Sequence, residues 1–551
     1  MIKTTSCPTH LVKRVAYHEM KHKAGFLSLT EELHFYILSF LSCRDILRCT
    51  SVCKALRQTY MSSSVLQYII ELSGQRLLPV PNTDNRTSAS SHLQTLRDRA
   101  YAWFKFDMHS FKSITLPEIF YAKEHLIIDG HLYFWDKYAE MAAIIPILPK
   151  SSQRTIERNW SPEMLRSVPN SVTLDVLMDP TQNLIAVVYS VVDDLEINEP
   201  VRIDLRELNG DIIHPKAAGR TLLASGPTAY NNSRTTWAKL KGCGRHIALQ
   251  RVILVAASDG RLPRIRYMWQ LQIWDWQNST TSSSVLGDMI LRPSNNRIDF
   301  CFLGINRLLV VAHDLKLYSI EDMSQTPQLL ACFLSPLPLS YPRCLLPMDN
   351  IEQLQMQVQQ MMYTSDPTHR LLCLTTSFGG STLVFVISTR IFFDLDGIAV
   401  ATPIPWKLWG PSNARIFRHR YRYPCRPHIS GNRVLQAFAV GTPDSMEYEI
   451  HMMDFSPLAV TNRQGLGRVV KEPSTIEIIG LASDNSREEL QTSLPYVEVV
   501  SDRKISVGEL ESIWLDNDRI YLLCVNRDRR SVAGFTQHLT SQSSRLEVID
   551  V

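Results

Sequence analysis

Residues 29–57 read LTEELHFYILSFLSCRDILRCTSVCKALR and hold the most informative pattern of the chain. Apolar residues recur there every three to four positions, a spacing that predicts short amphipathic helices. The first helix is predicted to begin at Ser28, because Ser28 and Glu31 have the spacing of a capping box. Further helix starts are predicted at Ser42 and Ser64, which gives a bundle of three short helices.

The predicted helices carry more apolar side chains than so small a bundle can bury. A segment of about 45 residues rarely forms a sufficient core alone. The excess therefore predicts a partner that covers one face, and packing against the chain's own following domain is the alternative. The apolar residues in question are Leu29, Leu33, Ile37, Leu38, Leu41, Ile46, Leu47, Val52 and Cys53.

The order and spacing of these residues resemble the F-box. The family pattern runs Leu-Pro-x-Glu-Leu, Ile-Leu-x-x-Leu, Asp-Leu-Leu-Arg and Val-Cys-Lys/Arg-x-Leu/Trp-Arg, and residues 27–71 match nearly all of it. Thr30 departs from it, since the family usually has proline there. Weaker similarity at residues 62–68, 93–103 and 409–415 extends the resemblance to the fungal, mushroom-type F-box proteins, which have a long C-terminal β-propeller-like region.

This resemblance implies a non-enzymatic interaction protein without a cofactor. It would be the substrate-receptor subunit of an SCF-type cullin-RING ubiquitin ligase, binding a Skp-type adaptor and, through it, a cullin. An adaptor-bound scaffold with no role in ubiquitination is the alternative. The residues expected to contact the adaptor are Leu29, Thr30, Leu33, Ile37, Leu38, Leu41, Ile46, Leu47, Val52 and Cys53.

The pattern changes from helical to strand-like near residue 105. Residues 79–91 are rich in Pro, Asn and Ser and predict a loop, and a helical pattern follows over residues 93–104. We therefore predict a multidomain α+β chain. Its parts are a polar N-terminal extension (1–26), an F-box (27–71), a loop with a linker helix (72–105) and a large all-β substrate-recognition domain (106–551).

Short apolar runs alternate with turn signals throughout the large domain. Turns such as Asp179-Pro180, Asn306-Arg307 and Gly379-Gly380 recur very roughly 50 to 85 residues apart. This repetition predicts an irregular β-propeller of six or seven blades, and a series of two-sheet sandwiches is the alternative. Trp274 and Trp276 stand two apart on one predicted strand, so both are expected to face one packing layer.

The composition narrows the class of protein. Of 551 residues, 45% are hydrophobic and 20% charged, which is typical of globular chains. The net charge of +4 is too small to favour a dedicated nucleic-acid or membrane-surface protein, and no apolar run approaches the roughly 18 residues of a membrane helix. The 11 cysteines form no CxxC pair, which favours a reduced cytoplasmic or nuclear location.

One motif offers an enzymatic alternative. His18-Glu19-Met20-Lys21-His22 matches H-E-x-x-H, in which two histidines on one helical face bind zinc and the glutamate acts as a base. The motif lies in a polar extension, and Lys21 places a positive charge between the two histidines. We therefore interpret it as a chance match, with no metal site, rather than as a zinc metallohydrolase.

The strongest basic run lies at residues 415–426, where aromatic residues are interleaved. Arginine forks bind carboxylates and phosphates in pairs of hydrogen bonds. Three interpretations are open: a solvated strand edge, a site for an acidic or phosphorylated peptide, and a nucleic-acid site. The candidate substrate-binding residues are Arg415, Arg418, Arg420 and Arg422.

Overall fold

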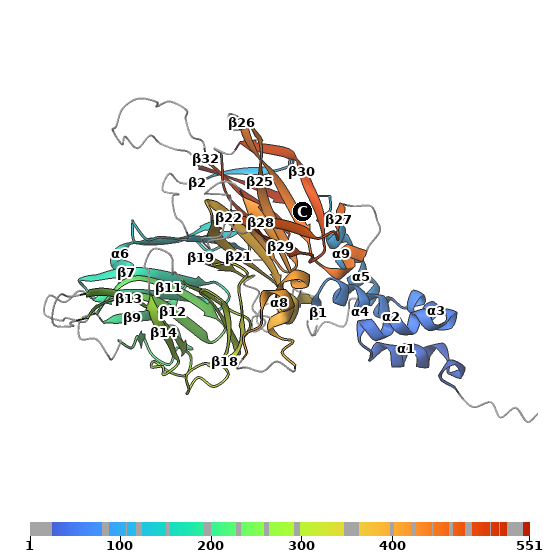
Figure 1. The fold of residues 1–551 in the computed structure, drawn as a ribbon, viewed down its shortest axis with the longest axis horizontal. Helices are drawn as coiled ribbons and strands as arrows, with labels where there is room; N and C mark the ends of the chain where they lie inside the picture. The colour runs from blue at the N-terminus through green and yellow to red at the C-terminus, as the bar shows by residue number, and fades with distance from the viewer. Residues whose placement is uncertain are drawn as a thin grey trace, which may run out of the picture. The chain divides into compact units, whose positions relative to one another are not determined.

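The computed structural model describes residues 25–79, 88–105, 107–116, 124–149, 155–191, 200–226, 233–257, 264–290, 298–346, 363–396, 402–419, 426–442, 445–461, 467–479, 487–506, 509–516, 518–525 and 544–551. The chain divides into two compact units. Unit 1 comprises residues 1–70 and 89–93, and unit 2 comprises residues 71–88 and 94–551. Figure 1 labels many of the elements of both units.

Unit 1 is a helical bundle with a small apolar core. Its core residues are Leu38, Ile46, Leu56, Leu66 and Ile70. Its elements are the 3₁₀ turn η1 (Phe26–Ser28), α1 (Glu31–Ser39), α2 (Cys43–Val52), α3 (Lys54–Ser62), the first part of α4 (Ser64–Gly74) and the first turn of α5 (Ala89–Ala102).

Two local details differ from the sequence prediction. Helix α1 begins at Glu31 after Thr30, and the Ser28 hydroxyl donates to Gly25 O at 2.7 Å, so the predicted capping box is wrong. The predicted second helix is divided into α2 and α3, because Cys53 has an extended backbone (φ −150°, ψ 164°) that interrupts the helical hydrogen bonds. The start at Ser42 is confirmed, since its side chain accepts from Asp45 N at 3.2 Å.

Unit 2 is a seven-bladed β-propeller, in which each blade is an antiparallel sheet. The first three blades each contain four strands that follow one another in the sequence. The first strands of blades 2 to 5 contact one another from blade to blade, and we call the first strand of a blade its innermost strand. Blade 1 contains β3 (Glu124–Ile128), β4 (His131–Asp136), β5 (Met141–Pro146) and β6 (Arg158–Trp160). Blade 2 contains β7 (Ser171–Asp179), β8 (Leu184–Val191), β9 (Val201–Glu207) and β10 (Thr221–Leu223). Blade 3 contains β11 (Ser233–Cys243), β12 (His246–Ala257), β13 (Arg264–Asp275) and β14 (Val285–Ile290).

The next three blades continue this order with insertions. Blade 4 contains β15 (Asp299–Phe302), β16 (Arg307–Val311), β17 (Leu315–Ser319) and β18 (Gln328–Phe333). Blade 5 contains β19 (Ser340–Leu345), β21 (Leu371–Phe378), β22 (Ser381–Ser388) and β23 (Ala414–His419). Blade 6 contains β24 (His428–Ser430), β25 (Arg433–Thr442), β26 (Ser445–Asp454), β30 (Tyr496–Ser506) and β27 (Arg468–Val470).

Blade 7 closes the ring by combining strands from both ends of the propeller sequence. It contains β31 (Leu510–Leu515), β32 (Arg519–Val525), β33 (Ser544–Asp550) and β2 (Lys112–Leu116). Strand β2 precedes blade 1 in the sequence but pairs antiparallel with β33. The ring is therefore closed by backbone hydrogen bonds, and the propeller prediction is confirmed with seven blades rather than six.

Smaller elements lie between the blade strands. A separate hairpin of β28 (Ser474–Ile479) and β29 (Arg487–Thr492) contributes Ile478 and Leu490 to the core of blades 4 and 5. The short helices of unit 2 are α6 (Pro162–Leu165), η3 (Pro367–His369), η4 (Thr389–Phe392), α8 (Trp406–Asn413) and α9 (Pro457–Thr461).

The linker between the two parts of the sequence belongs largely to unit 2. Strand β1 (Leu77–Pro79) pairs with β20 (Tyr363–Ser365), and Asp366 N donates to Arg76 O at 2.9 Å. Trp103, after α5, is 1% exposed in a cluster with residues of blades 6 and 7. The end of α4 and most of α5 therefore complete the packing of the propeller unit.

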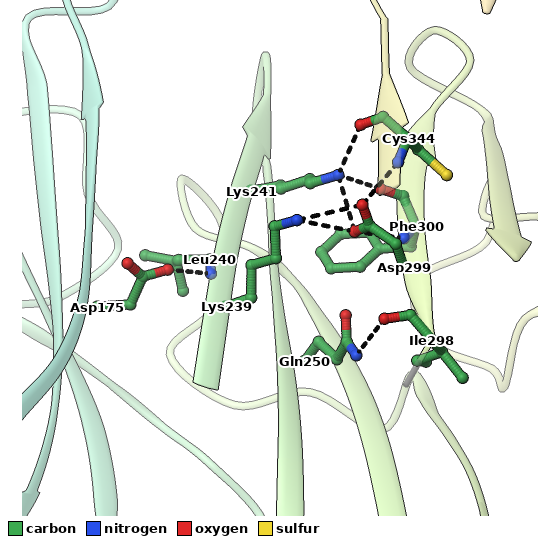
Figure 2. Close-up of polar contacts among 9 residues, drawn as sticks. All are labelled: Asp175, Lys239, Leu240, Lys241, Gln250, Ile298, Asp299, Phe300 and Cys344. Atoms are coloured by element: carbon green, nitrogen blue, oxygen red, sulfur yellow. Dashed lines mark hydrogen bonds and ion pairs between the residues drawn. The ribbon is translucent and has the colours of Figure 1, made fainter. Parts of the chain in front are cut away.

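Buried polar contacts connect the innermost strands of blades 2 to 5 (Figure 2). Asp175 on β7 accepts from Leu240 N on β11 at 2.7 Å. Asp299 on β15 accepts from Cys344 N on β19 at 2.7 Å and also from Lys239 Nζ (3.1 Å) and Lys241 Nζ (3.0 Å). Burial alone raises the pKa of Asp299, but the two lysines and the amide outweigh it and hold that pKa at about 2.

Removing Asp299 is predicted to destabilise the propeller strongly. Asp299→Ala leaves Lys239 and Lys241 without their carboxylate and Cys344 N without an acceptor, so we expect a loss of about 3–5 kcal/mol in the free energy of unfolding. Denaturant unfolding measures it. Asp288→Ala, at an exposed position on β14, is the control and should cost under about 0.5 kcal/mol. Equal stability of the two variants would contradict this role of Asp299.

The propeller is also predicted to lose stability in acid. Burial lowers the pKa of His246 from 6.5 to about 4. Between these two values the unfolded chain binds a proton at His246 that the folded chain does not, so stability falls as the pH falls through this range. Unfolding at pH 7.5 and at pH 4.5 measures the loss. His246→Gln should reduce this loss of unfolding free energy by about 2 kcal/mol. His313→Gln, at an exposed position, should leave the loss unchanged.

Candidate functional site

The outer side of α1 carries an apolar stripe. Leu33 is 47% exposed, Ile37 36% and Phe40, directly after the helix, 72%. Their spacing of three to four residues places these side chains on one helical face. His34 and Leu38 are buried on the other face, where His34 Nε2 hydrogen-bonds Phe26 O at 2.8 Å. Helix α1 therefore carries apolar residues on both sides. Such helices are normally buried, so the exposed outer side of α1 is a candidate contact surface.

Further exposed apolar side chains lie on the neighbouring elements of unit 1. We call the exposed set the outer apolar surface. It comprises Phe26, Leu27, Leu33, Tyr36, Ile37, Phe40, Leu47, Val52 and Met61. Tyr36 and Phe40 contact each other edge to face, with ring centroids 4.9 Å apart.

The predicted adaptor-contacting residues fall into two groups. Leu33, Ile37, Leu47 and Val52 are exposed and belong to the outer apolar surface. The other apolar members are wholly or partly buried: Leu29 is half-buried, Leu38 and Ile46 form the core of unit 1, and Leu41 and Cys53 pack against it. The exposed residues Phe26, Leu27, Tyr36, Phe40 and Met61 are not among the predicted contacts, although the helical spacing from Leu33 points to Tyr36 and Phe40.

Thr30 shows how the departure from the family pattern is accommodated. Its backbone has φ −67° and ψ 161°, the φ to which proline is fixed. The Thr30 side chain instead hydrogen-bonds the Glu32 carboxylate, which lowers the pKa of Glu32. The helix start keeps its geometry, and an acidic first turn suits the helix dipole.

The two arginines of the basic run that the structure describes form hydrogen bonds within the propeller unit. Arg415 is 3% exposed, donates to Thr492 O at 3.1 Å and to Glu472 O at 2.9 Å, and lies 5.2 Å from the centroid of the Tyr496 ring. Arg418 is exposed and donates to Glu477 O at 3.2 Å. Both arginines therefore hold the segment that contains the β28–β29 hairpin. Arg420 and Arg422 lie outside the described residues.

The other candidate features of the sequence have different outcomes. Trp274 and Trp276 are fully buried in one cluster between blades 2 and 3, as predicted from their spacing. The HEMKH motif at residues 18–22 lies outside the described residues. In the described part of the chain, no group of three or more His, Cys, Asp or Glu residues could hold a metal ion. No helix there is long and apolar enough to cross a membrane.

Similarity to known proteins is low over the chain as a whole. No curated protein matches the chain. Among solved structures, an uncharacterized protein, lmo1340, from Listeria monocytogenes EGD-e is 10% identical, with a TM-score of 0.27, over 75% of this chain and 92% of that one. Prolyl oligopeptidase B from Galerina marginata is 9% identical, with a TM-score of 0.18, over 66% and 58%. The α-L-arabinofuranosidase PaAbf62A from Podospora anserina is 10% identical, with a TM-score of 0.14, over 57% and 90%.

These structural similarities are too low to inform the function of the propeller. The family comparison is specific to unit 1, where residues 26–59 match the F-box domain. The matched segment contains η1, α1 and α2, most of α3, and all but one residue of the outer apolar surface. Residues 26–59 of this chain form an F-box domain, and the chain continues into a seven-bladed β-propeller.

Proposed function

We propose that the chain is the substrate-receptor subunit of an SCF-type cullin-RING ubiquitin ligase. The F-box domain binds a Skp-type adaptor and, through it, a cullin, while the propeller binds a target protein. The observation that carries this proposal is the outer apolar surface within the matched F-box segment. F-box domains generally bind Skp-type adaptors, and many exposed apolar side chains on so small a domain favour a partner that covers them.

The energetics of the outer apolar surface support a stable complex. Full burial of one Leu, Ile, Val or Phe side chain stabilises by about 1.5–3 kcal/mol. Leu33, Ile37 and Phe40 are each more than a third exposed. Covering them removes substantial apolar area from water, and such central apolar anchors dominate binding energies in protein interfaces.

The role proposed for the chain is positional rather than chemical. A bound target would be held near a ubiquitin-charged enzyme recruited through the cullin, so that transfer becomes effectively intramolecular. The chain would act in the cytoplasm or nucleus. The Arg415 guanidinium is buried and donates to two backbone carbonyls. Of the two arginines that the structure describes, the exposed Arg418 is therefore the better candidate for contact with an acidic target. Target binding by Arg420 and Arg422 stays a prediction.

Replacing Leu33 or Ile37 by aspartate is predicted to weaken adaptor binding strongly. Each change removes an apolar contact and places a charge in the interface, so we expect affinity to fall at least ~10-fold. Co-purification of the full chain with a Skp-type adaptor, followed by calorimetry, measures the loss. Gln58→Asp, at an exposed polar position on α3, should bind as the unchanged chain does.

Folding must be separated from binding in this experiment. Leu38→Asp charges a fully buried core position of the same helix, so it should unfold unit 1 and lose binding for that reason. Leu33→Asp and Ile37→Asp should instead keep the helical circular dichroism of the unchanged chain. Failure of the unchanged chain to bind any Skp-type adaptor would overturn the proposal.

Ubiquitin ligase activity distinguishes a substrate receptor from an adaptor-bound scaffold. We expect the complex purified from cells to contain a cullin and to form ubiquitin chains on a co-purified protein in the presence of ubiquitin-activating and ubiquitin-conjugating enzymes. The Leu33→Asp chain should form none. Adaptor binding without cullin or chain formation would favour the scaffold and exclude the receptor role.

A further inference from the structure

The face of blade 3 that packs against blade 2 changes from apolar to polar along β13. Trp274 and Trp276 are fully buried in the cluster between these two blades. Gln272 and Gln270 follow on the same face, because residues two apart on a strand point the same way. Arg251 on β12 is the direct register partner of Gln270 and is 3% exposed. The result is a buried polar cluster of Arg251, Gln270 and Gln272.

The Arg251 guanidinium lacks both a carboxylate partner and a full set of acceptors. Its two hydrogen bonds run from the same nitrogen, Nη2, to Ser225 O and to Gln270 Oε1. Its Nε–H is buried and has no acceptor within the described chain. Both acceptors are neutral, and no carboxylate of the described residues forms an ion pair with Arg251.

The charge of Arg251 persists at neutral pH. Burial lowers the pKa of this guanidinium to about 10, which leaves it protonated at pH 7. Burying a charge is costly unless an opposite charge and hydrogen bonds compensate it. Two bonds to neutral acceptors compensate the Arg251 charge only in part, so its unpartnered Nε–H could still bind an anionic group.

The cluster lies close beneath the surface at the end of β10. Ser225 is exposed, and Gln272 fixes it by accepting from Ser225 N at 2.9 Å and donating to Ser225 Oγ at 3.1 Å. Ser225 O in turn accepts from Arg251. Within the described residues, β10 is followed by Ala224, Ser225 and Gly226, which are all small, and Ser225 and Gly226 are exposed.

We propose that Arg251, with Gln270 and Ser225, forms a binding site for an oxyanion, a phosphate or carboxylate group, between blades 2 and 3. The Nε–H of Arg251 supplies an unused charged donor, and the Ser225 hydroxyl supplies a neutral one at the surface. Charge-assisted hydrogen bonds of this kind are roughly twice as strong as neutral ones. The proposal goes beyond the receptor function and does not depend on it.

Arg415 provides an internal comparison. It is equally buried and likewise lacks a carboxylate hydrogen-bond partner in the described chain, but its bonds leave from both Nη1 and Nη2 and its guanidinium lies over the Tyr496 ring. Its Nε is not among the buried atoms without a partner. Arg415 is therefore satisfied by the fold, and Arg251 is not.

Phosphate binding to the purified full chain tests the proposal. Calorimetry with inorganic phosphate, against chloride at matched ionic strength, should show one site on the unchanged chain. Arg251→Met should weaken it at least ~10-fold, because the charged donor is lost. Arg415→Met, the matched control at a buried arginine, should bind phosphate as the unchanged chain does if it folds.

A second measurement keeps the test independent of whether Arg251→Met folds. Phosphate at ten times its dissociation constant should raise the melting temperature of the unchanged chain by at least ~1 °C. Arg251→Lys, which keeps the charge but loses the Nε donor, should show a smaller rise. Absence of phosphate binding to the unchanged chain would overturn the proposal, as would equal binding by the Arg251 variants.

The source of the oxyanion is decided by competition. A short peptide with a central phosphoserine and its unphosphorylated counterpart are titrated against bound phosphate. Displacement by the phosphopeptide alone would assign the site to a modified side chain of a protein. Phosphate binding without displacement by either peptide would assign it to a free anion. A peptide that binds equally well with and without its phosphate, and still binds Arg251→Met, would contradict an oxyanion site at Arg251.

Discussion

Closure of the propeller ring is the constraint on which the large unit depends. Each blade buries its faces against two neighbours, so no blade is complete until the first and last meet. The pairing of β2 with β33 supplies that closure. The two strands are more than 400 residues apart in the sequence, so bringing them together costs loop-closure entropy. Local contacts between consecutive blades must therefore hold most of the ring before it closes.

The contacts of Asp175 and Asp299 provide this local cohesion. Asp175 accepts from Leu240, 65 residues away, and Asp299 from Cys344, 45 residues away. Each bond joins the innermost strands of consecutive blades, where both faces are buried and water cannot compete. A carboxylate is effective in this position, because a buried backbone N–H without an acceptor costs about as much as a lost hydrogen bond.

The sequence predicts what is periodic and misses what depends on distant partners. The helical spacing around Leu33 and Leu38 predicts α1, but it does not tell which side faces the core, since both sides are apolar. Trp274 and Trp276 were placed correctly because strand alternation is local. The roles of Asp299 and Arg415 could not be predicted, since their acceptors and donors come from other blades and from an inserted hairpin. The basic run illustrates the limit: clustered arginines in sequence need not be clustered on a surface.

Buried and half-buried cations on the propeller strands are compensated in different ways. Lys239 and Lys241 share the carboxylate of Asp299, so their charges stabilise the fold in return for their desolvation. Arg415 has no carboxylate bond but saturates its donors on carbonyl groups and an aromatic face. Arg251 has neither arrangement, although a methionine or leucine would fill the same space without a buried charge. A buried charge that an apolar side chain could replace lowers the stability of the fold. Such a residue therefore points to a role in binding rather than in stability.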